Sequence, residues 1–207
     1  MKLLAATRSA GKQREIRRAL ESAGITVVFP DELGFAESAV EDTLEVGDTF
    51  EENARRKAEY FARLTGLPVM ADDSGLEVSG LGGAPGVRSR RWAGATGSSD
   101  AVDDANNAEL LRRLAGLPAD RRRARYRCVL AFLPGQGAPV EFFQGTCSGL
   151  MLEVPRGSGG FGYDPLFLSD DLGITFGEAT AAAKDAVSHR GRALQAFARA
   201  VARGVHQ

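Results

Sequence analysis

The first third of the chain changes between two hydrophobic periods. Residues 2–6 form a short apolar run, which predicts a strand. After this run, apolar side chains recur at spacings of 3, 4 and 7 residues until Gly24, which predicts a helix. These side chains are Ile16, Ala19, Leu20 and Ala23. Residues 25–29 are rich in β-branched side chains and end at Pro30, so a second strand and hence a βαβ unit are expected.

The next segment, residues 31–48, is acidic and follows neither period, so we expect a loop or an irregular segment. Thr49-Phe50-Glu51-Glu52 fits a capping box, in which the Thr hydroxyl and a Glu carboxylate satisfy first-turn amides. It predicts a second long helix that ends at Gly66. Residues 67–71 are then expected to form a compact strand, and a third helix is expected from Ser99 to Gly116.

Strand composition returns in residues 125–132 and 140–143, on either side of a Pro-Gly turn at 134–137. This is the pattern of a hairpin. Because hairpin strands are antiparallel whereas a βαβ unit is parallel, the sheet is expected to be mixed.

The end of the chain predicts a short strand after Pro165 and a helix from about Ser188. No repeat and no linker separates independent hydrophobic patterns, so we expect a single α/β domain over residues 1–207. The predicted architecture is an elongated central mixed sheet flanked by helices, with two lobes and the active-site cleft between them.

Composition excludes several classes of protein. Lys and Arg number 26 against 27 Asp and Glu, a net charge of −1 that excludes a strongly basic nucleic-acid scaffold. No apolar run approaches the roughly 18 residues that span a bilayer, and the apolar start is too short for a signal peptide. We therefore expect a cytoplasmic protein with no nucleic-acid and no membrane partner. Cys128 and Cys147 lack metal-site spacing, so two buried thiols are expected.

The first candidate site is Thr7-Arg8-Ser9-Ala10-Gly11-Lys12, between the first strand and the first helix. Free amides and the positive end of the helix dipole attract phosphate there, and Lys12 adds a positive charge. The segment is not a P-loop, because Ala6 and Gln13 replace residues that motif requires. The chain has four lysines against 22 arginines, which favours a specific role for Lys12. The alternative is an ordinary turn with a solvated lysine.

The second candidate is Asp72-Asp73-Ser74-Gly75, placed at the carboxyl end of a predicted strand, where open α/β sheets bind ligands. Adjacent residues on an extended segment point in opposite directions, so we expect one catalytic and one structural carboxylate. Carboxylate oxygens are ligands that Mg²⁺ prefers. The alternative is a turn in which Asp and Ser cap backbone amides.

Two further candidates lie near the end of the chain. A glycine run leads into Phe161-Gly162-Tyr163-Asp164, where backbone can approach a flat ligand and a ring can stack on a base. The alternative is a tight loop with core aromatics. Lys184 and Ser188-His189-Arg190 form a cation cluster near a predicted helix start, and His189 is equally consistent with a purely structural role.

Taken in order, the motifs resemble those of the inosine/xanthosine triphosphate pyrophosphatases over nearly the whole chain. The motifs are ATRSAGK, TFEENA, ADDSGLEV, LGGAPGV, GTCSG, GSGGFGYDPLF, TFGE and SHRGRAL. The resemblance implies a homodimeric, Mg²⁺-dependent α/β enzyme. Such an enzyme splits non-standard purine nucleoside triphosphates, namely ITP, dITP and XTP, into the monophosphate and pyrophosphate.

The resemblance also implies residue roles. Thr7, Arg8, Ser9, Ala10, Gly11 and Lys12 match the phosphate-binding turn, although Arg8 stands where the family usually has Gly and Ser9 where it usually has Asn. Asp73 matches the general base and a metal ligand, with Ser74 on the substrate. In the family, a glutamate just before a Gly-x-Thr-Phe pattern helps to hold the metal. That pattern is residues 47–50 here and points to Glu45, with Glu41 as the alternative because the spacing to the pattern differs from that of the family. The base pocket and remaining substrate contacts match Phe161, Gly162, Tyr163, Asp164, Lys184, His189 and Arg190.

The mechanism that this supports is attack of water on the α-phosphorus, with Asp73 as base and Lys12 and Lys184 offsetting charge on the leaving pyrophosphate. Donors from Arg190 or from amides near Phe161 would pair with the C6 carbonyl of hypoxanthine or xanthine. Two rival functions are a related pyrophosphatase of modified pyrimidine nucleotides and a nucleotide sensor that binds without turnover.

Overall fold

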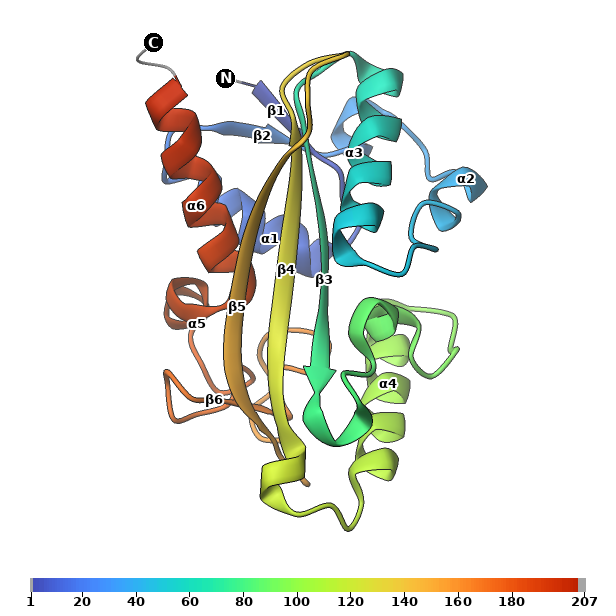
Figure 1. Cartoon of the computed structure of the whole chain (residues 1–207), viewed down its shortest axis with the longest axis vertical. Helices are drawn as coiled ribbons and strands as arrows, with labels where there is room; N and C mark the ends of the chain where they lie inside the picture. Colours follow the sequence, from blue (N-terminus) through green and yellow to red (C-terminus); the bar gives the residue numbers. More distant parts are fainter. Residues whose placement is uncertain (1, 205–207) are drawn as a thin grey trace. The chain divides into compact units, whose positions relative to one another are not determined.

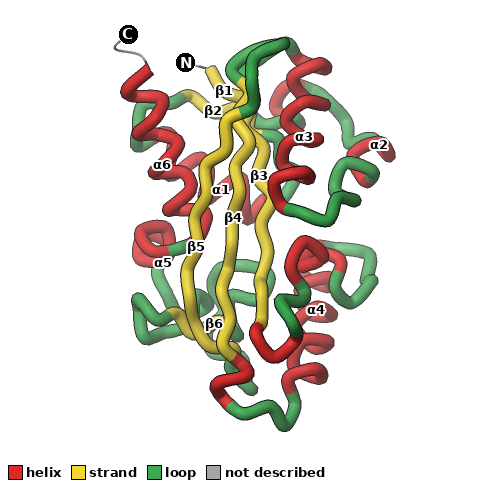
Figure 2. The backbone as a smooth tube through the Cα atoms, viewed as in Figure 1, coloured by secondary structure: helices red, strands yellow, loops and turns green. Residues whose placement is uncertain are grey.

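The computed structural model describes residues 2–204, whose strands form one sheet in the order β2-β1-β3-β4-β5-β6 (Figure 2). The strands are β1 (Lys2–Ala5), β2 (Thr26–Val28), β3 (Val69–Val78), β4 (Arg123–Leu133), β5 (Glu141–Met151) and β6 (Phe167–Ser169). β1 runs parallel to β2 and to β3, whereas β5 runs antiparallel to β6. The predicted α/β class and mixed sheet are therefore confirmed.

Helices flank this sheet (Figure 1). The described α-helices are α1 (Ala10–Glu21), α2 (Ala39–Asp42), α3 (Phe50–Thr65), α4 (Ser99–Leu114), α5 (Ala181–Val187) and α6 (His189–Gly204). Short 3₁₀ helices are η1 (Asp31–Leu33), η2 (Ser79–Leu81), η3 (Gly86–Arg91) and η4 (Ala119–Arg122). The predicted βαβ unit at the start of the chain is β1-α1-β2, with Lys2 opposite Thr26 in a parallel ladder.

The chain folds into two compact units, which we call the first unit and the second unit. The first unit comprises residues 1–73, 128–145 and 190–207, and the second comprises residues 74–127 and 146–189. The strands β3, β4 and β5 each contribute residues to both units. The predicted single domain and the predicted cleft between two lobes stay predictions.

One hydrophobic cluster forms the core of the first unit. Ile16 and Leu20 on α1 and Phe197 on α6 pack with side chains of β1 to β4. The ring of Phe197 meets those of Phe132 and Phe143 edge-on, with centroid distances of 5.0 and 5.4 Å. Each such side chain contributes about 1.5–3 kcal/mol when fully buried. This core holds α1 and α6 against the sheet that carries the acids.

A separate cluster forms the core of the second unit. Leu110 and Leu114 of α4 pack with Leu76 and Val78 of β3 and with aromatic side chains, all of them buried. Those aromatic side chains are Tyr126, Tyr163, Phe167 and Phe176. The rings of Tyr126 and Phe167 lie 4.7 Å apart between centroids. Aromatic pairs at this distance add specific geometry to hydrophobic burial.

β3 is longer than the sequence pattern indicates. The prediction that the acidic pair follows the end of a strand is wrong, because β3 continues through both acids as far as Val78. The alternative of a capping turn is wrong for the same reason. β1 ends at Ala5, opposite Met70, so the acids lie beyond the carboxyl end of the parallel neighbour. Sheet pairing here overrides the low strand propensity of Asp and Gly.

Smaller differences occur at helix ends. Segment 31–48 contains the short helices η1 and α2. The Thr49 hydroxyl accepts from the Glu52 amide at 3.1 Å, but the Glu52 carboxylate accepts from the Asp48 amide, so only half of the predicted capping box forms. Ser188 ends the unpredicted helix α5, and α6 begins one residue later.

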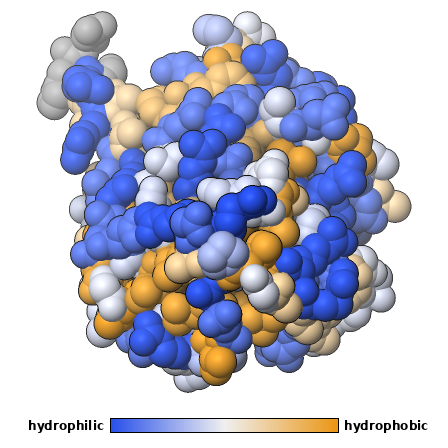
Figure 3. Space-filling model, turned by 60° about the horizontal axis from the view of Figure 1, so that its bottom comes forward, coloured by the Kyte–Doolittle hydropathy of each residue, from blue (hydrophilic) through white to orange (hydrophobic). Residues whose placement is uncertain are grey.

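Cys128 and Cys147 are buried and form no disulfide, which fits the prediction of two buried thiols. No helix within residues 2–204 is both long and apolar enough to cross a membrane. The face drawn in Figure 3 mixes hydrophilic and hydrophobic side chains.

A close backbone approach in the second unit gives a test of this fold. A Cβ atom at Gly75 would lie 2.3 Å from the Gly86 carbonyl oxygen and 2.5 Å from Ser89 Oγ. That hydroxyl already accepts from the Leu76 amide at 2.8 Å. We expect Gly75→Ala to lower the free energy of unfolding by about 1–3 kcal/mol, measured by urea denaturation. Gly135→Ala is the control because nothing lies within 4 Å there, and equal losses in both variants would contradict this packing.

Candidate active site

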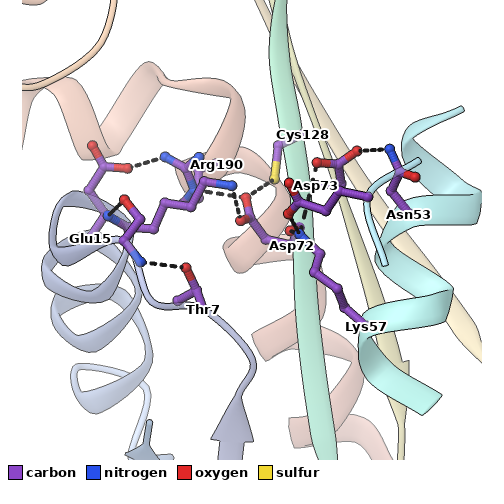
Figure 4. Close-up of polar contacts among 11 residues, drawn as sticks. Thr7, Glu15, Asn53, Lys57, Asp72, Asp73, Cys128 and Arg190 are labelled. Atoms are coloured by element: carbon purple, nitrogen blue, oxygen red, sulfur yellow. Dashed lines mark hydrogen bonds and ion pairs between the residues drawn. The ribbon is translucent and has the colours of Figure 1, made fainter. Parts of the chain in front are cut away.

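Two adjacent carboxylates on β3 serve opposite faces of the sheet. The side chain of Asp72 points toward Arg190 and α1, while that of Asp73 points toward Asn53 on α3 (Figure 4). Both residues are buried, with 2% and 5% of their surface exposed. Successive side chains of a strand point to opposite faces, so the two carboxylates have different partners.

The Asp72 carboxylate lies in a network of charged and polar groups that are buried or, for Lys12, half-buried. Lys12 Nζ lies 2.5 Å from Oδ1, and Arg190 Nε donates to Oδ2 at 3.1 Å. The Cys128 thiol donates to Oδ2 at 3.5 Å, and Arg190 also pairs with Glu15. We call these residues the Asp72 network: Lys12, Glu15, Asp72, Cys128 and Arg190. It joins α1, β3, β4 and α6 within the first unit.

Helix starts bring the two cations to Asp72. Ser9 is the N-cap of α1, so Lys12 lies in the first turn of that helix. Arg190 is in the first turn of α6 and is 2% exposed.

The charges of this network shift its pKa values. Burial alone would raise the pKa of Asp72, but Lys12, Arg190 and Lys57 outweigh it and hold that pKa well below the usual range. Burial and the nearby Asp72 carboxylate raise the pKa of the Cys128 thiol. The cations therefore favour the charged form of Asp72, and the prediction that one of the two acids is structural stays a prediction.

The Asp73 carboxylate faces α3. Asn53 donates to Oδ2 at 2.9 Å, and Lys57 Nζ lies 3.9 Å from Oδ1. The same ammonium donates to Glu45 at 2.6 Å and to the Asp72 carbonyl oxygen at 2.5 Å. Burial raises the pKa of Asp73, and the Glu45 carboxylate raises it further, while Lys57, Lys12 and Asn53 lower it. A buried carboxylate with a raised pKa is a stronger base than an exposed one.

The two candidates for the second metal ligand have different surroundings. Glu45 lies beside Lys57, next to Asp73. Glu41 caps helix α2 through the Ser38 amide and pairs with Arg8 through both carboxylate oxygens. The geometry therefore favours Glu45 over Glu41.

The turn between β1 and α1 is held by its own polar groups. The Ser9 amide donates to Thr7 Oγ1 at 3.2 Å, and Ser9 Oγ accepts from the Lys12 amide at 3.5 Å. No residue other than glycine has a positive φ in the described chain, so Arg8 fits this turn without left-handed backbone. The Arg8 side chain extends toward segment 31–41.

The remaining predicted residues belong to the second unit, apart from Arg190. Lys184 donates to the buried Asp164 carboxylate at 2.5 Å and lies 4.7 Å from the centroid of the Phe161 ring. The Tyr163 hydroxyl donates to the Ser89 carbonyl oxygen at 2.8 Å. Ser74 continues β3 at the start of this unit.

Several groups that were expected to contact the substrate make contacts within the protein. The Phe161 amide donates to Asp164 at 2.9 Å and the Gly162 amide to Asp103 at 2.7 Å, so each would have to leave its acceptor to pair with a base, and that pairing stays a prediction. His189 is buried and stacks on Tyr126, with ring centroids 4.6 Å apart. Ala10 and Gly11 begin α1.

Sequence reasoning missed three charged or polar residues: Glu15, Asn53 and Lys57. The last two were detectable, since they lie four residues apart and one residue before Ala54 and Ala58, on the apolar face of α3. Polar residues in phase with a buried helix face signal a specific partner. Glu15 precedes the buried Ile16 and gives no comparable signal.

Within residues 2–204, no three or more His, Cys, Asp or Glu side chains come together in a group that could hold a metal. A magnesium ion usually takes one or two carboxylates, with waters and substrate phosphates completing its shell. Asp73 and Glu45 are suited to that smaller requirement, because each carboxylate lies within 4 Å of Lys57 Nζ.

Comparison with known proteins gives consistent matches over nearly the whole chain. A model of the Ham1 family matches residues 3–200. The chain is 44% identical to the dITP/XTP pyrophosphatase of Anaeromyxobacter sp. (strain Fw109-5), covering 94% of both chains. It is 43% identical to the dITP/XTP pyrophosphatase of Escherichia coli O157:H7, covering 98% of this chain and 99% of that one.

Solved structures are also similar. A HAM1 protein from Coxiella burnetii has a TM-score of 0.83 and 32% identity, over 98% of this chain and 99% of that one. A structure titled nucleoside-triphosphatase / dITP/XTP pyrophosphatase, from Mycobacterium abscessus, has a TM-score of 0.72 and 40% identity, over 95% and 98% of the two chains.

The two acids are expected to differ in their effect on stability. Asp72→Asn leaves Lys12 and Arg190 without their counter-charge, so the free energy of unfolding at pH 7 should fall by about 3–5 kcal/mol. Asp73→Asn removes a carboxylate whose charged form burial disfavours, so stability should stay equal or rise. Urea denaturation measures both.

The pH dependence provides the control. The pKa of Asp72 is lower in the folded protein than in the unfolded chain, where it is about 4. Its charge therefore stabilises the fold above that pH, and this contribution is lost as the pH falls toward the pKa of the folded state. The difference between wild type and Asp72→Asn should therefore shrink below about pH 4. Equal losses in the two variants at pH 7 would contradict the assignment.

Proposed function

This chain belongs to the Ham1 family, and from that premise we propose that it hydrolyses ITP, dITP and XTP to the monophosphate and pyrophosphate. The observation that carries the proposal is the buried Asp73 carboxylate next to Asn53 and Lys57, one residue after the acid that pairs with Lys12. This arrangement combines a base with lysines suited to a polyanionic substrate.

The proposed triphosphate site is the turn of residues 7–12 at the start of α1. The positive end of the helix dipole and Lys12 both favour a bound phosphate. The Lys12 side chain is 18% exposed and its ammonium pairs with Asp72, so it can turn toward a phosphate while remaining near a fixed counter-charge. Lys12 thereby stabilises charge that develops on the leaving pyrophosphate.

Asp73 is proposed as the general base. Its raised pKa suits removal of a proton from an attacking water, and the Asn53 amide fixes the orientation of the carboxylate. Water attacks the α-phosphorus, and no covalent intermediate with the protein is required. Ser74, the next residue on β3, is proposed to contact the substrate.

Asp73 and Glu45 are proposed to hold Mg²⁺. Glu45 raises the pKa of Asp73, so the two carboxylates repel each other and a divalent cation between them would relieve that repulsion. When bound, Mg²⁺ supplies charge stabilisation for phosphate oxygens and for the attacking water. Lys57 lies within 4 Å of both carboxylates and holds them close together when no metal is bound.

The base pocket is proposed to include Phe161, with Gly162, Tyr163 and Asp164 setting the loop around it. Asp164 accepts from both the Phe161 amide and Lys184, so it fixes the ring and the ammonium together. Lys184 is proposed to assist on the phosphates, and His189 and Arg190 to position the contacting elements. On the family resemblance, we further propose a homodimer, a cytoplasmic location and no nucleic-acid or membrane partner.

The test is pyrophosphate release from a panel of nucleoside triphosphates with Mg²⁺. We expect turnover of ITP, dITP and XTP well above that of ATP and of modified pyrimidine nucleotides, loss on adding EDTA, and recovery with excess Mg²⁺. Binding of ITP without pyrophosphate release would instead indicate a sensor.

Two variants test the assigned roles. Lys12→Ala should lower kcat/KM by about ten- to a hundred-fold, through loss of a charge-assisted contact of about 1.5–3 kcal/mol. Asp73→Asn should abolish turnover and leave the protein folded. Lys2→Ala, which removes an exposed lysine from β1, is the control. The roles are wrong if Lys12→Ala matches this control or if Asp73→Asn keeps a tenth of wild-type kcat.

A further inference from the structure

The guanidinium of Arg8 uses all of its hydrogen-bond donors within the protein. Nε and Nη2 donate to the two carboxylate oxygens of Glu41, at 3.0 and 2.7 Å. Nη2 also donates to the Ala36 carbonyl at 3.1 Å. Nη1 donates to Asp31 and, at 2.7 Å, to the Phe35 carbonyl. A guanidinium has five N–H donors, and each one has an acceptor here.

A guanidinium whose five N–H groups all donate hydrogen bonds within the protein has no donor available for a phosphate. Arg8 would have to break one of these bonds to contact a substrate, and charge-assisted bonds are among the strongest in proteins. The Arg8 and Glu41 side chains are 18% and 12% exposed, whereas Asp31 is 57% exposed. The bidentate pair with Glu41 is therefore the shielded part of the contact and Asp31 the solvated part.

The acceptors of Arg8 all belong to the segment that leads to Glu45. Glu41 also completes the capping box of α2 with Ser38, so one carboxylate holds both the short helix and Arg8. At the other end of the segment, the Gly47 amide donates to Asn53 at 2.8 Å. Glu45 lies between these two attachments, one on the turn after β1 and the other on α3.

A four-residue helix does not hold such a segment by itself, because isolated short helices are unstable in water. The missing order comes from attachments to neighbouring elements: Arg8 holds Glu41, Asn53 accepts from the Gly47 amide, and Lys57 donates to Glu45 itself. The same Asn53 also fixes Asp73, so the second attachment sets the position of Glu45 relative to the proposed base.

We propose that Arg8 is a positioning residue, which holds segment 31–47 against the phosphate-binding turn so that Glu45 is kept beside Asp73, and that it makes no side-chain contact with the substrate. The expected effect on catalysis depends on the function proposed above. The attachment of the segment by Arg8 does not depend on that function.

The first test needs neither metal nor substrate. Hydrogen–deuterium exchange of the free protein reports the amides of α2 and its neighbours, such as that of Leu44, which donates to the Glu41 carbonyl. We expect Arg8→Ala to speed exchange in residues 38–45 about ten- to a hundred-fold, since charge-assisted bonds are lost. Glu41→Gln should give part of this effect.

Further variants separate the pair of Arg8 with Glu41 from the other contacts of Arg8. Arg8→Lys keeps the positive charge but cannot donate to both carboxylate oxygens of Glu41 at once, so it should give an intermediate effect. It also keeps the test decisive if Arg8→Ala does not fold. The double variant of Arg8→Ala and Glu41→Gln should exchange no faster than Arg8→Ala. Arg17→Ala is the matched control, because Arg17 pairs with Glu32 of the same segment without reaching Glu41, and it should leave residues 38–45 unchanged.

The second test uses Mg²⁺ and ITP. If Glu45 is in place for only a tenth of the time in Arg8→Ala, the Mg²⁺ concentration for half-maximal activity should rise about ten-fold. The kcat at saturating Mg²⁺ should stay within about two-fold of wild type, because bound metal restores the segment. A general loss of folding would not give this split.

Two results would overturn the proposal. One is exchange in residues 38–45 that is the same in wild type and in the Arg8 and Glu41 variants. The other is a fall in kcat with an unchanged Mg²⁺ requirement, which would place Arg8 on the substrate. If wild type releases no pyrophosphate, the proposed function fails, and faster exchange in Arg8→Ala but not in Arg17→Ala still supports the attachment.

Discussion

The negative charge of Asp72 in the protein interior is the constraint on which the first unit depends. An ionised carboxylate that is 2% exposed is stable only beside cations, and here the cations come from the first turns of α1 and α6. Satisfying this one charge fixes where both helices begin relative to β3. The proposed phosphate-binding turn, residues 7–12, runs into the start of α1, so its position follows from the same requirement.

The alternation of side chains along β3 gives the next residue a different environment. Asp73 faces α3, where Asn53 donates one hydrogen bond and Lys57 lies farther away, so burial dominates and the pKa rises. The fold thus gives two identical side chains opposite pKa shifts, a lowered one for Asp72 and a raised one for Asp73, the proposed base. A shift of β3 by one residue would exchange their faces, so the register of β3 with β1 specifies the chemistry as well as the sheet.

The sequence predicted most of the elements, because periodicity and end signals are local. It did not predict that β3 continues past Ala71, since that depends on pairing with strands far away in the chain. For the site, motif resemblance pointed to Asp73, Lys12 and Glu45, whose roles stay predictions, and the alternation rule anticipated that the two acids have different partners. The engagement of Arg8 with Glu41 and the use of the Phe161 amide by Asp164 were not predictable, because both need three-dimensional proximity.

The path of the chain between the two units has a consequence for how this protein can change. The chain passes from one unit to the other four times. The crossings follow Asp73, Arg127, Gly145 and His189. No continuous stretch of gene encodes either unit, so neither can be duplicated, lost or transplanted as a separate module. Asp72 and Asp73 of the first unit and residues 161–164 of the second unit are therefore inherited together. New specificities must arise by substitution within this one chain.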